Sequence, residues 1–195
     1  NSGVFSISDV ADLEKQGKFG GSLELIEEKS ISAVSSAIFT EIKETKYDVH
    51  FLTVENLDVS TNNTAVLIRF FENGVEESGN VYQYAYAYGD SNGTYTDYKS
   101  TGNDFLLTGL SIGSGTSREG HSFTKFYNLG NSSLFSGSWT QAFGQTGLGY
   151  GRFTWGGGQL PQASTVDQIK LFVTSGTFSC TAKLYGEKKW VLWDY

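Results

Sequence analysis

The sequence predicts an all-β protein, built as an antiparallel β-sandwich of about ten strands. First, residues 167–186 (DQIKLFVTSGTFSCTAKLYG) alternate apolar and polar side chains on both sides of Ser175-Gly176, which is the period of half-buried strands. Second, the chain contains 24 Gly, 14 Phe and 11 Tyr but one Pro, a composition suited to strands joined by glycine turns. Third, strand candidates follow one another through all 195 residues without a break in composition, which favours one large domain.

The two halves of residues 167–186 are expected to form an antiparallel hairpin around Ser175-Gly176, because a short glycine turn separates two period-two runs. One face of this hairpin is apolar and needs to be covered. The only partners that the chain offers are other strands, so two sheets packed face to face are the simplest arrangement.

The N-terminal stretch, residues 1–21, predicts the only helix. Ser6 or Ser8 can cap a short helix that ends at Gly17, because serine satisfies free amide groups at a helix start and glycine commonly ends a helix. We interpret this stretch as a segment that anchors the chain on the sandwich or on a neighbouring subunit. Residues 22–186 are then the sandwich domain.

Further strands are expected wherever apolar and aromatic residues alternate between turn signals. They are Leu23 to Ile31, Ile38 to Ile42, Tyr47 to Leu57, Ala65 to Phe71, Val81 to Tyr88, Phe105 to Leu110, Phe123 to Leu129, Ser138 to Phe143 and Tyr150 to Trp155. Tyr47 to Leu57 is apolar on both faces, as in a central strand. Asn73-Gly74 and Asn92-Gly93 predict tight turns, because both residue types accept a positive φ.

Residues 187–195 form an aromatic tail in which Trp190 and Trp193 lie beyond the last expected strand. Apolar surface of this kind is expected to be buried. The tail is therefore predicted to cover an open edge of the sandwich or to pack against another copy of the chain.

Charge and cysteine content restrict the partners and the compartment. The formal net charge is −7, which argues against nucleic acid or an anionic membrane as the main partner. The single cysteine, Cys180, is expected to be a small buried hydrophobic residue without a disulfide, as in proteins that fold in a reducing cytoplasm. No apolar run is long enough to cross a bilayer, and no charged and apolar leader opens the chain. Because the sequence lacks Met, residue 1 need not be the start of the gene product.

No residue pattern predicts catalysis, a metal or a cofactor. Residues 109–113 (GLSIG) match the G-x-S-x-G nucleophile pattern at Ser111, but no helical period follows, so a strand end and loop is the simpler interpretation. His50 and His121 are far apart in sequence and form no metal-binding spacing. Several acidic residues in expected loops could pair as in glycosidases, yet solvated loop charge is the default. They are Glu72, Glu76, Glu77, Asp90, Asp97, Asp104 and Glu119.

One strand, residues 81–88 (VYQYAYAY), places four tyrosines on one face. They are Tyr82, Tyr84, Tyr86 and Tyr88. The simpler interpretation is that this face packs on the opposing sheet with its hydroxyl groups at the margin. The alternative is a stacking platform for sugar rings or a subunit interface. Trp139 and Trp155 raise the same two possibilities, which exposure would separate.

Three segments extend the interpretation beyond periodicity: YDVHFLTVENL, TAVLIRFFENG and TVDQIKLFVTSGTFSCTAKLYG. Together with the opening GVFSISDVADLEKQGKFGG, they resemble virion structural proteins of tailed bacteriophages, particularly phages of aquatic bacteria. The resemblance implies a jelly-roll-like sandwich in a tail fibre, baseplate appendage or head decoration, commonly as a homotrimer, and it implies no catalytic residue. The chain lacks the long repetitive shaft of typical fibre proteins.

The leading hypothesis is therefore a non-enzymatic virion protein, assembled in the host cytoplasm. It would belong to the tail, oligomerise with itself, contact other virion proteins and present a site for host-surface polysaccharide. Three alternatives remain open at this point: a capsid decoration protein, a glycan depolymerase or esterase, and a free carbohydrate-binding module.

Overall fold

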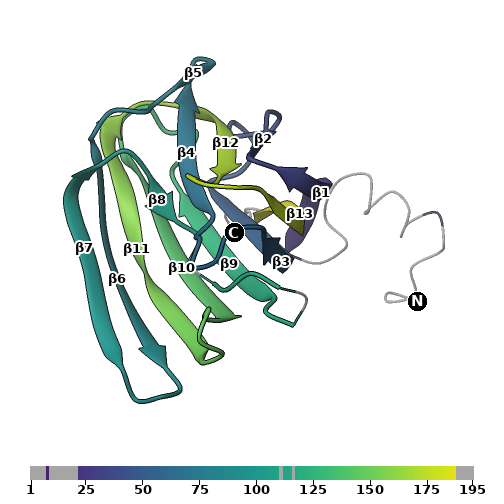
Figure 1. Cartoon of the computed structure of the whole chain (residues 1–195). Helices are drawn as coiled ribbons and strands as arrows, with labels where there is room; N and C mark the ends of the chain where they lie inside the picture. The colour runs from purple at the N-terminus through teal and green to yellow at the C-terminus, as the bar shows by residue number, and fades with distance from the viewer. Residues whose placement is uncertain (1–7, 9–21, 110–111, 116, 188–195) are drawn as a thin grey trace, which may run out of the picture.

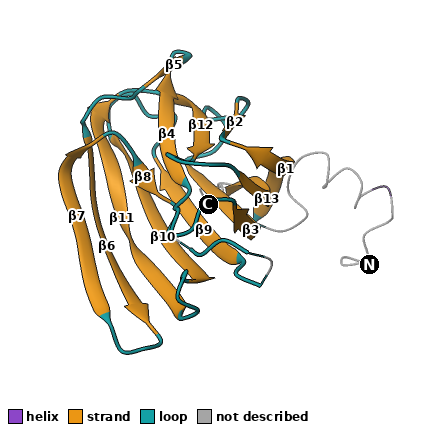
Figure 2. Ribbon diagram, in the orientation of Figure 1, coloured by secondary structure: helices purple, strands orange, loops and turns teal. Residues whose placement is uncertain are grey.

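The computed structural model of this chain describes Ser8 and residues 22–109, 112–115 and 117–187. From residue 22 onward every regular element within these ranges is a strand, and the 13 strands form two antiparallel sheets (Figures 1 and 2). The helix expected between Ser6 and Gly17 falls outside the described residues except for Ser8, and so do Trp190 and Trp193 of the tail.

The larger sheet has eight strands in the order β1-β13-β3-β9-β10-β11-β6-β7. Their bounds are β1 Leu23–Val34, β3 Val49–Val59, β6 Tyr82–Asp90, β7 Tyr95–Asn103, β9 Gly120–Tyr127, β10 Phe135–Gln145, β11 Gly151–Ala163 and β13 Phe178–Glu187. The smaller sheet has the order β2-β12-β4-β5, and β8 pairs with β4. Its strands are β2 Ser36–Phe39, β4 Leu67–Glu72, β5 Val75–Glu76, β8 Leu106–Leu107 and β12 Val166–Phe172.

The two sheets face each other across a large apolar cluster and a smaller one, so the sandwich-like all-β fold that the sequence predicts is confirmed. Leu52 of β3 and Leu184 of β13 contribute to the large cluster from the large sheet, and Phe70 of β4 and Ile169 of β12 contribute from the small one. All four side chains are buried. Cys180 lies in the same cluster, as expected, and burial raises the pKa of its thiol to about 12.

The predicted hairpin in residues 167–186 is wrong. β12 pairs with β2 and β4 in the small sheet, whereas β13 pairs with β1 and β3 in the large one. The connection between them crosses from one layer to the other. At its start the Val173 amide donates to the Ser35 carbonyl at 3.0 Å, and at its end the Thr177 carbonyl accepts from the Ser60 amide at 2.9 Å. Both strands keep an apolar face because both line the same core from opposite sides.

The part of the chain that the structure describes contains thirteen strands instead of about ten. β5 and β7 were not expected, because β5 is two residues long and β7 (YTDYKSTGN) is polar and lies at the edge of its sheet. The strand expected from Phe105 to Leu110 is reduced to Leu106–Leu107. β3 lies between β13 and β9, as expected of a central strand.

No helix among the described residues meets the length and apolarity needed to cross a membrane.

Candidate functional site

The outer face of the large sheet carries a group of partly exposed aromatic side chains, which we call the aromatic face. Its members are Phe51, Phe123, Trp139, Phe143, Phe153, Trp155 and Tyr185. They come from β3, β9, β10, β11 and β13, which are neighbours in the sheet. Trp139 is 41% exposed and Trp155 is 44% exposed, so both tryptophans noted in the sequence are accessible.

Alternation along β10 is inverted relative to an ordinary amphipathic strand. Ser136, Ser138 and Thr140 point into the protein and are buried, while Trp139 and Phe143 point outward and are exposed. A half-buried strand ordinarily places its apolar residues inward. β11 continues the inversion, since its Thr154 is buried.

Two of the three buried hydroxyl groups of β10, those of Ser138 and Thr140, form hydrogen bonds, whereas Ser136 Oγ has no partner among the described residues. The Thr124 and Thr140 hydroxyl groups lie 2.9 Å apart, and the Thr140 hydroxyl also donates to the Leu107 carbonyl at 3.4 Å. The Ser138 hydroxyl donates to the Gly158 carbonyl at 3.3 Å. These bonds offset the cost of burying hydroxyl groups, but they do not explain why the aromatic residues lie outside.

Aromatic contacts organise the face into two groups. A chain of rings crosses four strands, from Tyr185 through Phe51 and Phe123 to Trp139, with centroid separations of 6.4, 5.6 and 5.8 Å in that order. A second group pairs Phe143 with Phe153 at 5.2 Å. These contacts hold the rings in defined orientations. A ligand that binds them therefore restricts the side chains less, and binding costs less conformational entropy.

Hydrogen-bonding groups lie between the rings. In the strand register Gln141 of β10 stands between Phe123 of β9 and Trp155 of β11, and it is exposed. An open hollow of about 510 Å³ follows this part of the face, and Glu55, Gln141 and His121 are among its lining residues. The face therefore offers ring surfaces and polar groups side by side.

One end of the hollow carries charge. Glu55 accepts hydrogen bonds from Lys183 Nζ at 3.1 Å and from the Thr53 hydroxyl at 3.2 Å. The bond from Lys183 is the main reason that the pKa of the Glu55 carboxyl is lowered. His121 Nδ1 accepts from the Asn56 amide at 3.3 Å. These residues are held by bonds within the chain and are not arranged as a nucleophile and its base.

The tyrosine row of β6 lies on the opposite, inner side of the sheet. Tyr82 and Tyr86 are buried. The Tyr82 hydroxyl accepts from the Phe70 amide at 2.9 Å and donates to the Glu77 carbonyl at 3.1 Å. The Tyr86 hydroxyl donates to the Leu107 carbonyl at 3.1 Å. Burial is the largest cause that raises the pKa of both phenols, and for Tyr86 the pKa rises to about 12.

The other two tyrosines of the row are partly buried. The Tyr84 hydroxyl accepts from Asn103 Nδ2 at 2.9 Å, and the Arg152 guanidinium lies 4.1 Å from the Tyr88 ring centroid. Tyr82 and Tyr86 of the row are therefore buried on the inner side of the sheet, and the exposed rings of the aromatic face belong to other strands.

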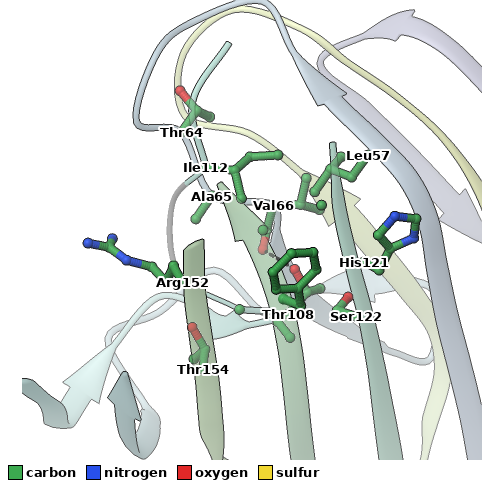
Figure 3. A pocket seen from close by; sticks show the side chains of 15 residues that line it. Leu57, Thr64, Ala65, Val66, Thr108, Ile112, His121, Ser122, Arg152 and Thr154 are labelled. Carbon is green, nitrogen blue, oxygen red and sulfur yellow. Dashed lines mark hydrogen bonds between the residues drawn. The ribbon is translucent and has the colours of Figure 1, made fainter. Parts of the chain in front are cut away.

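A second hollow is small, with space of about 20 Å³, which is enough for about one water molecule. Figure 3 shows Leu57, Val66 and Ile112 around it, with Arg152 and His121 on opposite sides. Arg152 is bonded to both carboxylate oxygens of Asp90, at 2.6 and 2.7 Å. The Arg152 guanidinium at this hollow is therefore engaged in an ion pair.

The remaining candidates from the sequence are placed as follows. Ser111 lies outside the described residues, and the described part of 112–119 contains no helix. His50 is buried, its Nε2 lies 2.8 Å from the Ile42 carbonyl oxygen, and burial lowers its pKa. Among the described residues no three His, Cys, Asp or Glu side chains gather as a metal site.

Most of the acidic residues considered as a catalytic pair are instead engaged in ion pairs. Glu76 and Asp104 both bind Arg69, and Asp97 binds Lys99 at 3.1 Å. A fourth, Asp90, binds Arg152 at 2.6 Å. Burial, followed by the nearby carboxylates of Glu77 and Asp167, raises the pKa of the Glu72 carboxyl.

Sequence reasoning missed five members of the face, namely Phe51, Phe123, Phe143, Phe153 and Tyr185. The signal was present, because β10 and β11 alternate large aromatic residues with Ser, Thr and Gly. Alternation alone does not say which side faces the core.

Comparisons with protein-family models, with curated proteins and with solved structures found no match to this chain.

Proposed function

We propose that this chain is a non-enzymatic adhesion and structural protein of a bacteriophage virion, part of a tail fibre or tail appendage. In this proposal the aromatic face binds a host cell-surface polysaccharide. The virion assignment is supported by the resemblance of the sequence to phage structural proteins.

The strand order supports the jelly-roll part of this proposal. The first and last strands, β1 and β13, pair in one sheet, while the second and the penultimate, β2 and β12, pair in the other. β3 then joins β13, and β4 joins β12. A chain that folds back on itself in two layers in this way has the double Greek-key character of jelly rolls, a class that includes capsid and lectin domains.

The observation that carries the binding function is the inversion of β10 and β11, with hydroxyl groups inside and aromatic rings outside. Exposing Trp139, Phe143, Phe153 and Trp155 forgoes the stabilisation that their burial would give. Departures from the folding pattern of this kind are expected at functional surfaces.

A polysaccharide fits the chemistry of this face. The C–H groups on one side of a sugar ring pack against the electron-rich face of an aromatic ring, and its hydroxyl groups need donors and acceptors nearby. Gln141, Glu55 and His121 supply such groups beside the rings. The partly exposed rings and the open shape of the hollow suit a long, polar chain lying across the strands.

The test is affinity electrophoresis of the purified protein through gels that contain capsular polysaccharides or O-antigens of aquatic bacteria. At least one polymer is expected to retard the protein. Trp139→Ala and Trp155→Ala should each weaken this retardation tenfold or more. Leu148→Ala is the matched control, because Leu148 is 82% exposed in the turn of the same β10–β11 hairpin but lies off the face.

Two results would overturn the binding proposal: no retardation by any polymer, or tryptophan variants that migrate like the parent protein. Release of new reducing ends from a bound polymer would instead make the chain a depolymerase. Immunogold labelling of phage particles addresses location, since label on heads would favour capsid decoration over a tail appendage.

A further inference from the structure

β7 forms the outer edge of the large sheet and pairs on one side with β6 (Figure 1). Such an edge leaves a row of backbone N–H and C=O groups available to another strand. The strand is well exposed, with Tyr95 at 77% and Tyr98 at 48%. Among the described strands none covers its outer side.

The direction of the β7 backbone groups follows from the turn that precedes it. The Asp90 amide donates to the Thr94 carbonyl at 2.9 Å, so these two residues form a hydrogen-bonded pair. In an antiparallel ladder hydrogen-bonded and non-hydrogen-bonded pairs alternate. Thr96, Tyr98 and Ser100 therefore direct their backbone groups toward β6, and Asp97 and Lys99 direct theirs outward.

The charges of β7 are arranged symmetrically about Tyr98. The strand reads YTDYKSTGN, and its only charged residues are Asp97 and Lys99. Both side chains are highly exposed, at 72% and 80%, and Lys99 Nζ lies 3.1 Å from Asp97 Oδ2 within the chain. If a second copy of β7 lies antiparallel to the first about a two-fold axis at Tyr98, Asp97 stands opposite Lys99 of the second copy, and the reverse pair forms by symmetry.

Only this two-fold register places opposite charges against each other. An axis at Asp97 or at Lys99 would set like charges directly opposite, which destabilises a strand pair. The register at Tyr98 also matches the backbone, because Asp97 and Lys99 are the residues whose N–H and C=O groups point outward. A bulge at the end of β7, between the pairs Tyr84–Ser100 and Tyr82–Asn103, limits the regular edge to residues 95–100.

We propose that two copies of this chain associate through β7, antiparallel about a two-fold axis at Tyr98. The two large sheets then join as one continuous sheet, with both aromatic faces on the same side of it. The result is a dimer in place of the homotrimer that the resemblance implies. This proposal specifies the self-association of the virion protein and does not depend on polysaccharide binding.

Charge reversal tests the pairing by light scattering coupled to size-exclusion chromatography. The parent protein is expected to have the mass of two chains. Asp97→Lys and Lys99→Asp should each give the mass of one chain, with a dissociation constant raised tenfold or more, because like charges then meet across the axis. An equimolar mixture of the two variants should recover the two-chain mass, since one edge is then positive and the other negative. Glu119→Lys, an exposed charge reversal outside β7, should leave the mass unchanged.

A cysteine at the axis tests the register itself. Tyr98 and its symmetry mate would be a non-hydrogen-bonded pair, whose Cα atoms lie about 4.5 Å apart, within the range that a disulfide spans. Tyr98→Cys should therefore form a covalent dimer in air, and Tyr95→Cys should not.

A parent mass of one or three chains, single variants that keep the dimer mass, or variants that fail to associate when mixed would each overturn the pairing. Binding of a short oligosaccharide by the one-chain variants separates the two proposals. If Trp139→Ala loses oligosaccharide binding, that result concerns the aromatic face alone. If Asp97→Lys keeps oligosaccharide binding, the β7 edge is a surface separate from the aromatic face.

Discussion

At the scale of single residues, the same chemical group has different roles on the two sides of the large sheet. Tyr82 and Tyr86 are buried on the inner side, where their hydroxyl groups bond backbone atoms of β4 and β8. Trp139 and Trp155 stand on the outer side, more than 40% exposed. The inner rings stabilise the fold because each polar tip has a partner. The outer rings are available for binding.

The buried tyrosines predict a loss of stability at alkaline pH. Burial raises the pKa of Tyr86 from 10.0 to about 12, so the folded state holds the phenol proton more tightly than the unfolded state. The stability that the protonated Tyr86 phenol contributes to the folded state is complete below pH 10 and is lost as pH rises toward 12. The slope for one such group is at most about 1.4 kcal/mol per pH unit.

Urea unfolding across pH 8 to 12 measures this effect. Tyr86→Phe should be less stable than the parent at pH 8 by about 1 to 2 kcal/mol, because the Leu107 carbonyl loses its hydrogen bond from the Tyr86 hydroxyl. Its free energy of unfolding should nevertheless fall less steeply above pH 10. Tyr95→Phe, with a hydroxyl on an exposed ring, should match the parent throughout. Equal slopes for the parent and Tyr86→Phe would contradict the assignment.

At the scale of elements, the sequence predicts which segments are strands better than it predicts their partners. Period-two alternation identified both β12 and β13, because each has one buried face. It did not show that they belong to different sheets, since alternation describes a strand and its faces but not its neighbours. β7 was missed because the edge position leaves it polar. For β10 the strand was found, but which side carries the core was not encoded in the alternation.

Glycines in β11 predict where this sheet does not tolerate a side chain. A Cβ at Gly158 would lie 2.7 Å from the Gln83 carbonyl oxygen and 2.6 Å from Leu106 Cδ2. Gly158→Ala should therefore lower the free energy of unfolding by about 1 to 3 kcal/mol, the usual cost of overpacking.

Gly137→Ala on the adjacent β10 is the control. Its Cβ would meet nothing closer than the Gly158 carbonyl oxygen at 3.9 Å, so its effect should stay within about 0.5 kcal/mol. Denaturant unfolding of the two variants compares them directly. Similar destabilisation by both would mean that a loss of backbone flexibility, and not the close approach of β6, β8 and β11, sets the requirement for glycine.

At the scale of the whole molecule, the two proposals have a joint consequence. A sandwich whose aromatic face lies on the outer side of its large sheet, and whose edge strand pairs with its own copy, would present two faces to one surface. Two weak sites on one rigid body bind a repeating polymer more tightly than one site does, because the second contact forms within the complex. A short ligand that reaches one site gains nothing from the pairing.

The dimer should therefore raise affinity for polymer but not for oligosaccharide. Asp97→Lys is expected to bind a short oligosaccharide like the parent protein by isothermal titration calorimetry, because Asp97 lies outside the aromatic face. Its apparent affinity for the long polymer in affinity gels should fall tenfold or more, within the range that linked sites provide. Trp139→Ala should lose both kinds of binding. If Asp97→Lys kept the full polymer affinity while running as a single chain, the two faces would not act together on one polymer.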